Sequence, residues 1–187
     1  MFTGEKIAQM ATFFMVKENG CQIPILKLVK LLYLADRESI DRYDEPISYD
    51  KMVSMEHGPV LSRTYDLICG CVGGNDARQW GAWISNRATN DVVLKKKNIS
   101  REALDHLSDA DIEVLETVWG QFGHMNKWQI RRYTHEHCEE WEDTQGSSWP
   151  IDNIRLLLAL GRNEQEAKEA AHLIDEQREL DRAISTA

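Results

Sequence analysis

Hydrophobic residues between positions 25 and 40 repeat with the spacing of an α-helix. Further apolar residues fill most of the remaining circumference of the helix that this spacing predicts. The apolar positions are Ile25, Leu26, Leu28, Val29, Leu31, Leu32, Tyr33, Leu34 and Ala35. A helix that is apolar on nearly all sides lies inside a domain, so its few charged residues need partners there. We therefore expect this segment to be the central helix of the fold.

The same kind of spacing predicts several more helices along the chain. They are expected over residues 3–19 with Gly20 as the stop, 59–70, 108–123, 126–137, 150–160 and 163–185, with a helical turn at 49–55. Residues 73–76 are expected to form a loop. Between residues 80 and 97 the pattern changes, and we expect a small β-hairpin that carries Trp80 and Trp83 and packs on the helices.

These elements predict a mainly α fold, in which a compact helical domain carries the small hairpin. We place the helical domain at residues 1–145 and a C-terminal helical extension, packed on the same domain, at residues 146–187. The last predicted helix has only a thin apolar stripe, formed by Leu173, Leu180 and Ile184. Such a narrow stripe suits a peripheral helix or one that docks on another chain.

Charge and composition limit the classes of partner. The 187 residues carry a formal net charge of −9, which disfavours a phosphate backbone and favours a basic protein. The basic clusters at 95–97 and 131–132 are too small to offset it, so DNA binding is not expected. No apolar run is long enough to span a membrane. Four cysteines without a disulfide-like pattern indicate reduced thiols and a cytoplasmic protein.

Candidate chemistry is sparse. Nucleotide-binding glycine motifs and a nucleophile elbow are absent from the sequence. His124, His135, His137 and Cys138 are the best metal candidates, yet helical residues two apart point about 200° away from each other. We favour ordinary packing for them and expect no cofactor, with a small metal-dependent enzyme as the alternative. The neighbouring carboxylates at 109 and 111, and at 139 and 140, are expected to be solvated.

Three blocks of sequence together resemble the Panacea domain, the family of SocA-like antitoxins and related phage-associated proteins. The first is KLVKLLYLA at residues 27–35, and the second is Gly58-Pro59-Val60 with Tyr65 five residues later. The third runs from Leu107 to Gly123 and continues to Thr134-His135 and Trp141. The residues that carry the resemblance are Lys30, Tyr33, Asp36, Gly58, Pro59, Val60, Tyr65, Trp119, His135 and Trp141.

The resemblance implies an antitoxin that neutralises a cognate toxin by direct binding. The toxin is expected to be basic, and SocA-like members imply delivery to a Clp-type protease as an alternative route. An exposed apolar patch with an acidic rim is expected, formed by Trp80 and Trp83 or by Leu173 and Leu180. Core packing of the two tryptophans is an equally strong interpretation. We also expect Lys30, Asp36 and His135 to form one buried polar network.

Overall fold

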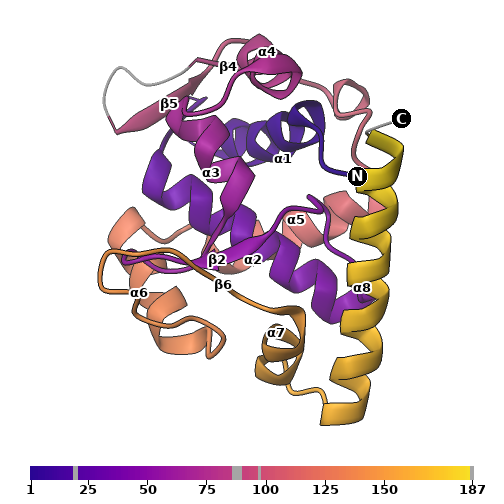
Figure 1. Cartoon of the computed structure of the whole chain (residues 1–187). Coiled ribbons are helices and arrows are strands. Elements are labelled where there is room, and N and C mark those ends of the chain that lie inside the picture. The colour runs from indigo at the N-terminus through magenta and orange to yellow at the C-terminus, as the bar shows by residue number, and fades with distance from the viewer. Residues whose placement is uncertain (19–20, 86–89, 97, 186–187) are drawn as a thin grey trace.

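The chain folds around the helix predicted at its centre. The computed structural model describes residues 1–18, 21–85, 90–96 and 98–185 (Figure 1). In this part the helices are α1 (Gly4–Lys17), α2 (Ile25–Tyr43), α3 (Ser62–Cys69), α4 (Gly74–Trp83), α5 (Asp109–Phe122), α6 (Lys127–His137), α7 (Asn153–Ala159) and α8 (Glu164–Ser185), with a 3-10 turn η2 (Arg101–Ala103). The strands are β1 (Gln22–Pro24), β2 (Met52–Ser54), β3 (Val60–Leu61), β4 (Ile84–Ser85), β5 (Asp91–Leu94) and β6 (Trp149–Pro150). The predicted mainly α fold is confirmed.

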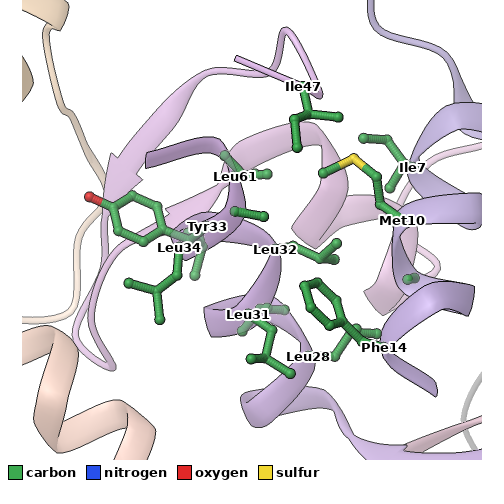
Figure 2. Close-up of a cluster of buried hydrophobic side chains, with 14 of the residues drawn as sticks. Ile7, Met10, Phe14, Leu28, Leu31, Leu32, Tyr33, Leu34, Ile47 and Leu61 are labelled. Carbon is green, nitrogen blue, oxygen red and sulfur yellow. The ribbon is translucent and has the colours of Figure 1, made fainter. Parts of the chain in front are cut away.

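Helix α2 crosses the middle of the molecule and is packed by α1, α5 and α6 (Figure 1). Pro24 precedes it in an extended conformation, where the missing N–H of proline costs nothing. Asp44 ends it in the left-handed conformation. Figure 2 shows Leu28, Leu31 and Leu32 packed with apolar residues of α1. The core therefore forms around the stretch that the sequence singles out.

Side-chain caps set the beginnings of other helices. Thr3 caps α1, and Ser108 and Asn126 form reciprocal capping boxes at the start of α5 and α6. Gly70 ends α3 with a positive φ of 71°, as glycine readily does. Gly20, the predicted stop of the first helix, lies outside the described residues.

Two small antiparallel sheets pack beside the helices. One has the strand order β1-β5-β4, with Gln22 opposite Val93 and Ile84 opposite Leu94. The other has the order β3-β2-β6, with Val53 paired to Val60 on one side and Pro150 on the other. The second sheet thus joins segments that are about a hundred residues apart in sequence.

The second sheet corrects three predictions. The turn expected at residues 49–55 contains strand β2, and the helix expected from Pro59 begins only at Ser62, because Val60 and Leu61 pair with β2. Likewise Pro150 lies in β6, and α7 starts after its cap, Asp152. In each case long-range strand pairing decides the local conformation, which short sequence windows do not reveal.

The predicted hairpin is smaller than expected. It consists of β4 and β5, whereas Trp80 and Trp83 lie in helix α4, and α4 begins at Gly74 where a loop was expected. Residues 86–89, on which part of the expected hairpin turn falls, and Lys97 lie outside the described residues. Figure 1 shows α4 and the hairpin together at one end of the molecule.

The segment after residue 145 contacts the rest of the chain at several points. Strand β6 extends the β2 sheet, and the Arg178 guanidinium donates to the backbone oxygen of Asp50 at 2.8 Å. Helix α8 packs on α7 and buries the face that carries Ala167, Ala171 and Ile174. A domain boundary near residue 145 stays a prediction.

Candidate functional site

A stripe of polar residues follows the central helix at every third position. Lys27, Lys30, Tyr33 and Asp36 are all buried. Each step of three residues turns by about 300°, which is about 60° short of a full helical turn. Over the three steps from Lys27 to Asp36 the stripe therefore winds half-way around α2. Each member contacts a different connecting segment. We call these four residues the anchor stripe.

Lys27 and Lys30 hold two of these segments through backbone oxygens. The Lys27 ammonium donates to the Gly123 oxygen at 2.8 Å and to the Glu18 carboxylate at 2.7 Å. The Lys30 ammonium donates to the Pro59 oxygen at 2.7 Å. Burial lowers the pKa of Lys30 to about 7. A fully buried amine therefore ties the Gly-Pro-Val segment to the central helix.

Gly58 fits this contact because it has no side chain. Its φ is +94°, and a Cβ atom built on it would lie 2.9 Å from the Lys30 Nζ and 3.0 Å from the Thr134 Oγ1. The same Cβ would lie 3.1 Å from a ring carbon of His135. Both the backbone conformation and the close approach of α2 and α6 thus require glycine.

Tyr33 anchors the segment that follows α6. Its hydroxyl donates to the buried Glu140 carboxylate, which also accepts from the Arg37 Nε at 2.7 Å. Burial, and next the Glu140 charge, raise the pKa of Tyr33 well above its ordinary value. Because Glu140 is buried, the expectation of a solvated carboxylate is wrong for it; two partners on α2 make its burial tolerable.

Asp36 anchors the turn after α2 and does not join Lys30 and His135 in one network. Its carboxylate accepts from the backbone N–H of Ser48 at 2.9 Å and from the Ser48 hydroxyl. Burial raises the pKa of Asp36 to about 7. The predicted single network is therefore corrected: Lys30 and His135 meet at Gly58, and Asp36 has Ser48 as a partner.

We call the ten residues that carry the resemblance the signature residues, and three more of their rings, those of Trp119, His135 and Trp141, take part in packing. The rings of His135 and Trp141 stack with centroids 4.0 Å apart, and the Trp141 indole N–H donates to the Met55 oxygen at 2.9 Å. Trp119 lies 6.3 Å from the ring of Phe14, and the Lys27 ammonium lies 5.3 Å from the Trp119 ring. These contacts hold α5, α6 and the β2–β3 turn against the core.

One groove is lined by several of the signature residues, and we call it the signature groove. It has a volume of about 510 Å³ and lies between the start of α2, the β2–β3 turn and the start of α6. Lys30, Gly58, Val60 and Tyr65 contribute to its wall, and Trp128 lines it with 59% of its surface exposed. Trp128 was not among the site residues predicted from the sequence, although its position two residues after a helix cap suggests exposure.

Trp80 and Trp83 do not form an exposed patch. They are 1% and 3% exposed, and the Trp83 indole N–H donates to the Glu5 carboxylate at 2.6 Å. Helix α4 packs against α1, and the Lys96 ammonium lies over the Trp83 ring, 3.3 Å from its centroid. Both tryptophans are therefore core residues, which is the alternative interpretation given for them from the sequence.

Leu173 and Leu180 on α8 are exposed, at 61% and 59%. They line a groove of about 320 Å³ between α8 and the segment that follows α2, which we call the α8 groove. Its other lining residues are Tyr43, Asp44, Glu45, Pro46, Tyr49, Ile174, Glu176 and Gln177. An exposed apolar pair with neighbouring carboxylates, as expected for a partner-binding surface, therefore occurs here.

The metal candidates do not converge. The His137 Nδ1 lies 3.1 Å from the Tyr133 oxygen, His135 stacks on Trp141, and burial raises the pKa of the Cys138 thiol to about 12. Within the described ranges, no three His, Cys, Asp or Glu side chains are grouped closely enough to hold a metal ion. The same ranges contain no helix that is long and apolar enough to cross a membrane.

A comparison of the chain with models of protein families finds one matching family. The model of the SocA-like antitoxin, Panacea domain, matches residues 28–142. No curated protein and no solved structure matches the chain significantly. The matched range contains the anchor stripe from Lys30 onward and most of the residues that line the signature groove, whereas α8 lies beyond it.

Proposed function

Because the chain belongs to the Panacea family of SocA-like antitoxins, we propose that it is an antitoxin that neutralises a toxin protein by binding it directly. The observation that carries this proposal is the family match over residues 28–142, which contains all ten residues of the resemblance. In this proposal the anchor stripe keeps the domain folded, and the surface around it binds the toxin.

Charge supports a basic partner. A chain with a net charge of −9 attracts a basic protein through long-range steering and repels acidic ones. Toxins that act on RNA are often basic, because they must approach phosphates. An acidic antitoxin covering such a surface would block the access of RNA without any chemistry of its own.

A growth assay tests this proposal. The protein encoded beside this chain in its operon is expressed from one inducible promoter, and the full chain from another. We expect the neighbour alone to stop growth and the chain to restore it. If growth is restored only in cells that have an active Clp-type protease, the chain acts by delivering the toxin for proteolysis. Growth arrest that persists with the folded chain present would refute neutralisation.

A further inference from the structure

The exposed leucines of α8 lie on a different face from the one that packs on the protein. The buried face carries Ala167, Ala171 and Ile174. Leu173 and Leu180 are seven residues apart, so they lie nearly in line along the helix, about 10 Å from each other. Figure 1 shows α8 along the outside of the molecule. Two large aliphatic side chains in line, with more than half of their surface exposed, are unusual away from an interface.

The opposite wall of the α8 groove is formed by the end of α2 and the segment after it. Tyr43 is exposed there, and Pro46 and Tyr49 complete the wall. The volume of about 320 Å³ suits a few side chains from one element and is too small for a folded domain to enter. This shape fits an amphipathic helix that inserts apolar side chains at i, i+3 or i+4, and i+7.

Charge indicates which kind of helix fits. Asp44, Glu45 and Glu176 line the groove, and none of its described lining residues is Lys or Arg. Asp44 is paired with Arg162 at 3.1 Å and Glu176 lies 3.4 Å from the His172 ring nitrogen, whereas the Glu45 carboxylate has a tyrosine hydroxyl and no cation as its partner among the described residues. Carboxylates beside an apolar groove favour Lys and Arg at the edges of the partner's apolar face.

The same charges disfavour a second copy of this chain. Helix α8 contains seven Asp or Glu residues and three Lys or Arg residues, a net charge of −4. Pairing two copies through this face would place like charges beside each other, which is costly at an interface.

We infer that the α8 groove is the docking site for a basic amphipathic helix of the partner protein, with Leu173 and Leu180 as the apolar contacts. This inference rests on the proposed function for the identity of the partner as the toxin. Because α8 lies outside the range matched by the family model, this surface gives the chain a means of selecting its own toxin that is separate from the family domain.

The test compares the variant L173E/L180E with the matched control L158E. Leu158 is also an exposed leucine, on α7, but it does not line the α8 groove. The probe is a fluorescent 18-residue helical peptide of Leu and Lys with its leucines on one face, and a peptide of the same composition with dispersed leucines serves as its control. Anisotropy gives the dissociation constants, thermal unfolding checks the fold, and the growth assay is run in parallel.

We expect the amphipathic peptide to bind the wild-type chain and L158E equally. Its binding to L173E/L180E should be weaker by at least about tenfold, because two apolar contacts are lost and exposed Glu–Lys pairs with the peptide contribute much less than the burial of two leucines. Growth rescue should fail for L173E/L180E and persist for L158E. Equal peptide binding by all three proteins would overturn the inference.

The two proposals fail in different ways. If the wild-type chain and L173E/L180E both restore growth, the docking site is refuted and the antitoxin proposal stands. If the wild-type chain does not restore growth but the peptide still distinguishes the variants, the groove recognises basic helices and the antitoxin proposal is refuted. A dimer in sedimentation that L173E/L180E abolishes would overturn the inference in favour of a second copy.

Discussion

At the scale of single residues, Gly58 offers the sharpest test of the close approach between α2, α6 and the Gly-Pro-Val segment. Replacing it by alanine adds a Cβ 2.9 Å from the buried Lys30 ammonium in a backbone conformation with φ of +94°. We expect Gly58→Ala to lower the free energy of unfolding by about 2–4 kcal/mol, from backbone strain and overpacking together. Urea denaturation measures it.

Gly146→Ala is the matched control for this change. Gly146 has nearly the same φ, +91°, but a Cβ there would have no neighbour within 4 Å. This variant should therefore show only the cost of backbone strain, about 1 kcal/mol. Equal losses for the two variants would mean that the close approach at Gly58 contributes nothing.

The pKa of Asp36 predicts a pH dependence of stability. Burial raises it from 3.8 to about 7, so the folded protein holds a proton that the unfolded chain releases. The stability that this group contributes is full below about pH 4 and is lost as the pH rises to about 7. The variant Asp36→Asn can keep its contacts with Ser48 and does not ionise. Between pH 4 and pH 7, we expect the free energy of unfolding of Asp36→Asn to decline by about 1–3 kcal/mol less than that of the wild type.

Urea denaturation at several pH values makes this comparison. Asp41→Asn is the control, since that side chain is exposed and makes no hydrogen bond or ion pair among the described residues, and its series should run parallel to the wild type. An Asp36→Asn series that also runs parallel to the wild type would contradict the assigned shift.

At the scale of elements, α2 shows what the sequence can predict and what it cannot. Its apolar spacing predicted the central helix, and the same kind of spacing predicted α5 and α6, which begin at the caps Ser108 and Asn126, because these signals are local. The partners of the anchor stripe were not predictable in the same way. Glu140 lies 107 residues from Tyr33, and no local pattern separates it from its exposed neighbour Glu139.

The short strands were missed for the same physical reason. Strands β2, β3 and β6 have two or three residues each, and their conformation depends on pairing across the fold. The resemblance did identify the Gly-Pro-Val segment, but only the structure shows that Lys30 holds it. On α8 the apolar spacing predicted a thin stripe of Leu173, Leu180 and Ile184. Leu173 and Leu180 are indeed exposed, while small residues, Ala167 and Ala171, make much of the packed face.

A double-mutant cycle tests whether the anchor stripe consists of separate links. Tyr33→Phe and Glu140→Gln remove the two sides of one buried contact. We expect each to cost about 1–3 kcal/mol and the pair to show a coupling energy of at least about 1 kcal/mol. Tyr33→Phe combined with Asp36→Asn should be additive within about 0.5 kcal/mol, because these residues hold different segments. Additivity in the first cycle would show that Tyr33 and Glu140 do not act together.

At the scale of the whole molecule, buried polar links and exposed surface have different roles. The links from α2 hold the connecting segments of the family domain in place, and four of the ten residues that carry the family resemblance take part in them: Lys30, Tyr33, Asp36 and Pro59. The surface that remains is acidic and includes the signature groove, most of which lies in the family domain, and the α8 groove, which is built partly by α8. Binding another protein is the function that this arrangement supports best.

The most direct test of that function is complex formation between purified proteins. The full chain is mixed with the protein encoded beside it, in a catalytically inactive form that cells tolerate, and native mass spectrometry with titration calorimetry measures the product. We predict a defined complex that weakens as salt rises, as expected for an acidic chain bound to a basic partner. Two folded proteins that stay separate at micromolar concentration and low salt would contradict the account.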